Sequence, residues 1–367
     1  MKKSLLALAV LGAFAGAASA QTNVTIYGLV DAGVQYVKVK DGEFNESVMG
    51  LESGLNGGSR LGFKGSEDLG GGLSAIFALE NGFTADDGKL DQDSRLFGRQ
   101  AFVGLQGGFG AVKLGRQYSP IFTAVDSVDP FATNLAGSML QIFNTYGIRT
   151  DNTINYSLPN MGGFYGQVAY TFGESTEGTS ANRQLGLSVG YANGPINAVV
   201  AYHNAKDELG DNSERTTFVG GSYDFGVAKA HAAFADNKGF SSAAAPFTAI
   251  YGNVFTAAEI DDVEADLEDD LDDVGIKSRD YMLGVSAPVS AAGKVMASYQ
   301  RKNFRDLPVA GLDIKADVFA IGYIHALSKR TSLYTSASRM TADWKEAGEP
   351  SEEIKRTVFN VGVQHRF

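Results

Sequence analysis

Apolar and polar residues alternate with a period of two along most of this chain. In residues 24–36, most apolar side chains share one parity and the polar side chains the other. The same alternation returns in residues 73–80, 164–172, 185–191 and 359–367. Alternation of this kind predicts β-strands rather than helices. We therefore expect an all-β chain.

The connections between the predicted strands alternate between short and long. Counting gives about sixteen strands of about ten residues each, the length that a tilted strand needs to cross a bilayer. Short turns are predicted near Gly70, Gly107, Gly162, Gly194, Gly226, Ala292 and Lys329. Long connections are predicted at residues 40–58, 84–94, 115–151, 174–182, 204–214, 236–278, 302–315 and 341–354. Tight turns at one end and loops at the other are typical of outer-membrane barrels.

The two faces of the predicted strands differ in a way that favours a membrane barrel. The apolar face recurs on nearly every strand and often carries Tyr or Phe near the strand ends. The other face carries Arg, Lys, Glu, Gln, Ser, Thr and Gly. A closed sheet with an apolar outside and a polar, glycine-rich inside fits a water-filled transmembrane barrel. The alternative, a secreted β-sandwich or β-helix, requires many apolar residues on inward faces.

The first twenty residues have the pattern of a secretory signal peptide. Two lysines precede an apolar run from Leu5 to Ala17, and residues 18–20 form a small-residue cleavage site. The run is too short to span a membrane. We expect cleavage after Ala20, which leaves residues 21–367 as one exported domain. The alternative is an uncleaved helical anchor.

Composition narrows the chemistry further. The chain has no cysteine, 45 glycines, 8 prolines, 23 phenylalanines and 15 tyrosines, which favours many strands and turns held by sheet closure instead of disulfides. Its formal charge of −11, or −13 without the two leader lysines, argues against nucleic-acid binding. The four histidines lack metal-ligand spacing and no nucleophile-elbow motif occurs. We expect no enzymatic activity and no cofactor.

One connection, from Gly115 to Asp151, is unusually long for a compact β domain. Loops of this length are usually functional. We predict a 16-stranded antiparallel transmembrane β-barrel in which this third loop folds into the lumen and sets the width and charge of a pore. Its Asp126 and Asp129 are the candidates for the acidic side of that constriction.

Charged residues predicted to face the lumen complete the constriction. Arg60 and Lys64 lie on the polar parity of their strand, Glu80 lies on that of the next, and Arg149 shares parity with polar neighbours. Arg99 shares parity with apolar positions, so its inward placement requires a bulge or a wall that faces another subunit. Unpaired outward arginines are not expected, because a lipid-facing arginine at mid-depth costs roughly 2–4 kcal/mol. A basic wall opposite acidic groups makes a transverse field and a size filter.

An acidic run from Glu259 to Asp273 holds ten carboxylates in fifteen residues. It lacks the ligand ladder and central glycine of an EF-hand, so no metal site is assigned. One interpretation is a solvated surface loop or short helix. The other is a weak divalent-ion site that bridges to lipopolysaccharide phosphates at the barrel rim.

Several motifs, in order and at fitting spacings, resemble those of Gram-negative general porins, especially the β-proteobacterial ones. The motifs are Val24–Asp31 (VTIYGLVD), Ser59–Gly70 (SRLGFKGSEDLG), Arg99–Leu105 (RQAFVGL), Gly115–Gln117 (GRQ) and Gln364–Phe367 (QHRF). The resemblance implies a sixteen-stranded barrel, assembly as a homotrimer, an inward third loop and a basic cluster opposite acidic residues. It also implies that Arg116 supports the base of the third loop and that Phe367 is the signal read by the barrel-assembly machinery.

These observations lead to one main functional hypothesis and two alternatives. The main hypothesis is passive diffusion of ions and small hydrophilic solutes through a porin in the Gram-negative outer membrane, in contact with lipid and lipopolysaccharide. The alternatives are a substrate-selective channel and a barrel anchor or adhesin that presents long surface loops. The arginines favour anions at the constriction, whereas the acidic groups offset them, so ion selectivity stays open at this stage.

Overall fold

The computed structural model describes residues 23–42, 44–211, 213–240, 276–307, 311–345, 348 and 351–367. The predicted signal peptide and the acidic run from Glu259 to Asp273 lie outside these residues. Cleavage after Ala20 therefore stays a prediction. Among the described residues, no helix combines the length and the hydropathy that a membrane span requires.

The described residues form one antiparallel sheet of eighteen strand segments. The segments are β1 (Asn23–Asp41), β2 (Phe44–Ser53), β3 (Arg60–Gly70), β4 (Leu73–Gly82), β5 (Gln100–Gly107), β6 (Gly110–Tyr118), β7 (Arg149–Thr150), β8 (Thr153–Ser157), β9 (Phe164–Thr171), β10 (Gln184–Asn193), β11 (Ile196–Lys206), β12 (Ser213–Asp224), β13 (Lys229–Phe240), β14 (Ile276–Pro288), β15 (Gly293–Arg305), β16 (Asp313–Ala326), β17 (Thr331–Lys345) and β18 (Glu352–Arg366). Two helices, α2 (Pro120–Val128) and η1 (Met139–Gln141), lie between β6 and β7.

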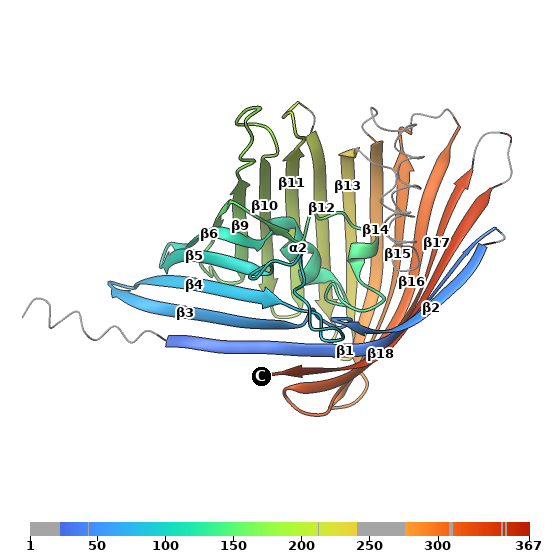
Figure 1. Cartoon of the computed structure of the whole chain (residues 1–367), viewed down its shortest axis with the longest axis horizontal. Coiled ribbons are helices and arrows are strands. Elements are labelled where there is room, and N and C mark those ends of the chain that lie inside the picture. The colour runs from blue at the N-terminus through green and yellow to red at the C-terminus, as the bar shows by residue number, and fades with distance from the viewer. Residues whose placement is uncertain are drawn as a thin grey trace, which may run out of the picture.

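The sheet closes into a barrel of sixteen strands. β2 and β3 pair with successive halves of one edge of β1, so together they make one interrupted strand. β7 and β8 pair in the same way with β6. The other edge of β1 pairs with β18, which joins the first strand to the last (Figure 1). The predicted sixteen-stranded antiparallel barrel is confirmed.

The seven predicted short turns are present, but one predicted loop is not. Residues 40–58 were expected to form a long connection. Instead β1 continues to Asp41, and β2 begins at Phe44 and pairs along β1 through Ser53. Every residue of β2 lies opposite a residue of β1, and cross-strand pairs such as Val48 and Val37 stabilise the sheet there. That prediction was wrong because the period-two pattern in Phe44–Ser53 is interrupted by charged and small residues.

The outer face of the barrel is apolar, as predicted. On β14 the side chains of Tyr281, Leu283 and Val285 are exposed, whereas the intervening Asp280 and Met282 are buried. A period-two strand of a closed sheet places such alternating side chains on opposite faces. The exposed apolar positions are therefore the lipid-facing ones.

The inner face is less uniformly polar than predicted. Met282, Val318 and Met340 are buried on the inner parity of their strands, where they join one apolar cluster with Met139 and Phe143. The last two belong to residues 119–148, which we call the loop 3 segment. The expectation of a polar, glycine-rich interior was wrong for this part of the wall, because apolar side chains there are covered by the loop 3 segment and are not wetted.

Candidate functional site

The loop 3 segment begins with a capped helix. Ser119 is the N-cap of α2, and its hydroxyl accepts a hydrogen bond from the backbone N–H of Phe122 at 3.3 Å. Pro120 follows at the first helical position, where its missing N–H costs nothing. The helix buries Ile121 and Val125 on one side and contacts β9 to β13. Figure 1 shows α2 beside β11 and β12.

Hydrogen bonds tie α2 and the rest of the loop 3 segment to strands far apart around the sheet. Asn197 of β11 donates to the carbonyl of Ser127 at 2.9 Å. Gln300 of β15 donates to the carbonyl of Gly137 at 2.8 Å. The backbone N–H of Ala136 donates to Ser336 Oγ of β17 at 3.0 Å. These contacts all reach inner-parity residues, so the segment lies on the face opposite the exposed apolar side chains.

Glu80 is the centre of a charged cluster on β3, β4 and the approach to β5. Arg99 Nε donates to Glu80 Oε1 at 2.7 Å, and Tyr27 Oη donates to Glu80 Oε2 at 2.8 Å. Arg60 Nη1 lies 4.0 Å from Glu80 Oε1. Glu80 and Arg99 are only 2% and 6% exposed, so burial and the charge-assisted hydrogen bond hold this pair in place. The negative charge of Glu80 also attracts the guanidinium of Arg60.

Tyr118, at the end of β6, joins two arginines. Its hydroxyl accepts hydrogen bonds from Arg99 Nη2 at 3.0 Å and from Arg149 Nη2 at 3.2 Å. The guanidinium carbon of Arg149 also lies 4.7 Å from the Tyr118 ring centroid, within the range of a cation–π contact. The sequence did not indicate a role for Tyr118. Its position directly after the Gly115–Gln117 motif was the available signal.

One cavity of about 510 Å³ brings the wall and the loop 3 segment together. Arg60, Arg99 and Arg149 line it from the wall, and Asp126 lines it from α2. Asp91 lines it as well and was missed, because the residues before β5 show no strand pattern. The structure thus gathers four of the predicted constriction residues around one space, and Glu80 is buried behind them, bonded to Arg99.

Arg99 reaches this cavity without the bulge that its parity seemed to require. It lies just before β5, which begins at Gln100. Outside the strand the rule of alternating faces does not apply, so its guanidinium can turn inward to Glu80. Neither a bulge nor a subunit-facing wall is needed.

Lys64 and Asp129 do not line the cavity. Lys64 is on the face of Arg60 but four residues further along β3, and its ammonium lies 5.1 Å from the Tyr27 ring centroid. Asp129 is buried, and its carboxylate accepts hydrogen bonds from the backbone N–H groups of Phe131, Thr133 and Met139 at 2.8–3.0 Å. The prediction that Asp129 faces the pore was wrong, because the turn that follows α2 uses its carboxylate as an acceptor. Burial raises the pKa of Asp129 to about 7.

The two ends of the loop 3 segment are joined through Asp151. Arg116 Nη1 lies 2.7 Å from Asp151 Oδ1, and Arg116 Nε donates to the carbonyl of Gly98 at 2.6 Å. Arg95 Nη1 lies 2.6 Å from the other carboxylate oxygen.

At the chain end, the Phe367 backbone exchanges hydrogen bonds with that of Gly28 at 3.1 and 3.2 Å. Within the described residues no cluster of three or more potential metal ligands occurs.

Comparison with known proteins identifies the family to which this barrel belongs. A family model described as Gram-negative porin matches residues 7–344. The chain belongs to the Gram-negative porin family. Outer membrane porins of Bordetella pertussis and of Delftia acidovorans are each 36% identical to it, with all of both chains covered. The solved structure of an anion-selective porin from Comamonas acidovorans is similar with a TM-score of 0.74 and 31% identity, over 95% of this chain and all of that one.

This porin is therefore a diffusion channel of the Gram-negative outer membrane. The exposed apolar wall faces lipid, and the long connections lie at one end of the barrel, with the short β1–β2 turn among them, whereas the other short turns lie at the opposite end. The resemblance drawn from the sequence motifs is confirmed.

Proposed function

We propose that the loop 3 segment narrows the lumen of this porin and that the cavity around Arg60, Arg99 and Arg149 is its constriction. The convergence of three guanidinium groups and Asp126 on one space carries this proposal. Solutes that pass would meet fixed positive charge on the wall and a carboxylate on α2. The paired charges make a field across the path, which filters solutes by size and by dipole as well as by net charge.

The three guanidinium groups around the cavity outnumber its two carboxylates, Asp91 and Asp126, and so favour anions over cations there. Nearer the short-turn end the inner parity carries Lys64, Lys113, Lys229 and Lys294, together with the carboxylates of Asp68 and Asp224. Glu80 is held by Arg99 and Tyr27, so much of its charge is compensated. The similar porin from Comamonas acidovorans is described as anion-selective, and we extend that preference to this chain.

The sharpest test is the reversal potential of the open channel under a salt gradient. Arg60→Ala should shift selectivity toward cations, because it removes a positive charge from the cavity while Glu80 and Asp126 stay. Arg215→Ala is the matched control, since Arg215 is exposed on the outer parity of β12. An unchanged reversal potential in Arg60→Ala would remove Arg60 from the constriction.

The same proposal covers assembly and partners. We extend to this chain the homotrimer typical of general porins, the contact of its outer wall with lipid and lipopolysaccharide, and the reading of Phe367 by the barrel-assembly machinery. Planar-bilayer recordings should show three linked conductance steps for each insertion. Single isolated steps in every recording would contradict the trimer.

A further inference from the structure

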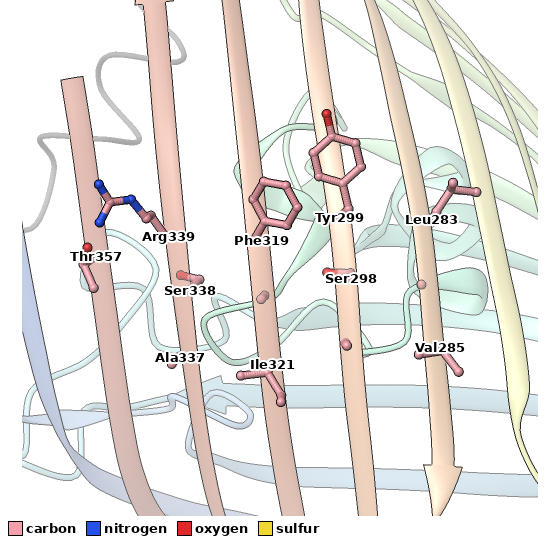
Figure 2. Close-up of a pocket in the computed structure, with 13 residues that line it drawn as sticks. Leu283, Val285, Ser298, Tyr299, Phe319, Ile321, Ala337, Ser338, Arg339 and Thr357 are labelled. Carbon is pink, nitrogen blue, oxygen red and sulfur yellow. The ribbon is translucent and has the colours of Figure 1, made fainter. Parts of the chain in front are cut away.

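A shallow groove of about 660 Å³ runs along the outer wall across β14 to β18. The outward side chains form two rows in register. The upper row is Leu283, Tyr299, Phe319, Arg339 and Thr357, and the lower row is Val285, Ala297, Ile321, Ala337 and Phe359. Ala297 and Ala337 line the groove, and their small side chains leave the depression between larger neighbours. Figure 2 shows Ala337 beside Ile321, with Phe319 above them.

Arg339 stands directly above Ala337 on the same strand. It is exposed on the outer parity of β17, beside Phe319 on one neighbouring strand and Thr357 on the other. Figure 2 shows its guanidinium at the upper margin of the groove. Among the residues that the structure describes, no ion pair or hydrogen bond to this guanidinium is found. A bare charge on a lipid-facing wall is unfavourable, so the position calls for an anion from outside the chain.

The nearest acidic side chains on this face are already engaged. Asp317, one outward position above Phe319, receives Arg301 through two bonds of 2.7 and 2.8 Å and the Tyr299 hydroxyl at 2.6 Å. Further up, Asp343 on Arg339's own strand lies 3.9 Å from the Lys315 ammonium, and Glu353 on the next strand is paired with Lys355. None of these three carboxylates is left for Arg339, so the surface presents an uncompensated positive charge beside an apolar groove.

The height of Arg339 along β17 indicates which membrane leaflet it contacts. Below it, β17 presents Ala337, Thr335 and Leu333 outward, and above it come only Thr341, Asp343 and Lys345. Arg339 thus marks the upper edge of the apolar band. That edge is on the side of the long connections, which in such barrels face the cell exterior. The exterior leaflet of this membrane consists of lipopolysaccharide, whose lipid A carries phosphates directly above its acyl chains.

We propose that this groove is a lipid A site, in which Arg339 binds a lipid A phosphate and an acyl chain lies over Ala337 and Ala297. The inference deepens the lipopolysaccharide contact proposed above and is independent of the pore. A phosphate oxygen suits a guanidinium because the donors form two parallel hydrogen bonds. The Thr357 hydroxyl, at the same level on β18, is available as a further donor. The chain below the phosphate gains contact with apolar side chains that a flat wall would not offer.

The test uses the full-length porin in detergent micelles, with native mass spectrometry to count bound lipid. Probes are bisphosphorylated lipid A, its dephosphorylated form and phosphatidylglycerol. Arg339→Gln should weaken binding of bisphosphorylated lipid A roughly tenfold, the loss of a charge-assisted contact, and leave the dephosphorylated form unchanged. Ala337→Phe fills the groove and should weaken both forms. Both substitutions are on the outer surface, so folding should be retained.

Arg215→Gln is the matched control, because Arg215 is also exposed on the outer parity but lies at the loop end of β12, away from the groove. Equal loss in Arg339→Gln and Arg215→Gln would overturn the site, as would equal competition by phosphatidylglycerol. A loss of the oligomer in Arg339→Gln would show a subunit interface instead. Conductance and ion selectivity should be those of the wild type in Arg339→Gln, which separates failure of this site from failure of the proposed constriction.

Discussion

Glu80→Gln should make the channel markedly more anion-selective. Glu80 is buried directly behind two residues that line the cavity: it is bonded to Arg99 and Tyr27 and lies 4.0 Å from Arg60. Glutamine keeps the shape and one acceptor oxygen, so the main change is the loss of one negative charge. The three arginines of the cavity would then be offset only by Asp91 and Asp126.

The size of the effect follows from Coulomb's law. An anion in contact with the Arg60 guanidinium lies about 4–8 Å from the carboxylate of Glu80, and two unit charges at that separation interact by about 0.5–1 kcal/mol in water. Removing the repulsion raises the local anion population roughly 2- to 6-fold, and the same change lowers the cation population by a similar factor. The ratio of anion to cation permeability should therefore rise by about an order of magnitude. Salt screens this effect, so it should shrink at high ionic strength.

The assay is the reversal potential of single channels under a tenfold gradient of potassium chloride, at low and at high total salt. Glu67→Gln provides the control, because Glu67 is exposed on the outer parity of β3 and its neutralisation should leave selectivity unchanged. A permeability ratio within twofold of the wild type, in a Glu80→Gln protein that still forms open channels, would refute the placement of Glu80 at the constriction.

Two further substitutions test groups that hold the site in place. Asp129→Asn should flatten the pH dependence of unfolding. The pKa of Asp129 in the folded protein, about 7, lies above the ordinary value of 3.8. The stabilisation from this group is therefore present at low pH and is lost as pH rises through 7. Denaturant titrations of the wild type and the variant at pH 5 and pH 8 measure the difference. Lys302→Met should cost about 3–5 kcal/mol of unfolding free energy, because it strands the fully buried Asp280 that lies 3.1 Å from the lysine ammonium; the double variant with Asp280→Asn should recover part of that loss in the same titration.

The barrel could be predicted because each strand and turn is encoded by residues close together in the sequence. Alternation along each strand and the positions of turn residues suffice to place strands, and closure follows from the need to pair every edge in a membrane. Arg60 and Glu80 could be assigned to the inner wall by the same alternation. Arg149 could not be placed by alternation alone, because the pairing register shifts by one residue between β7, where Arg149 lies opposite Tyr118, and β8. Arg99 could not, because its orientation depends on a bend outside the strand and on an acid nineteen residues away in sequence.

The loop 3 segment marks the limit of such reasoning. Its length and its two aspartates indicated a constriction, but the roles of the aspartates depend on how the segment folds. Asp126 lines the cavity, whereas the carboxylate of Asp129, three residues later, accepts hydrogen bonds from three backbone N–H groups. The fold of the segment also accounts for the buried Met282 and Met340 on a wall expected to be wet, because both join an apolar cluster with its Met139 and Phe143. An apolar side chain on the inner parity has no meaning for a strand alone. It becomes interpretable only beside the segment that covers it, and that pairing joins residues more than a hundred positions apart.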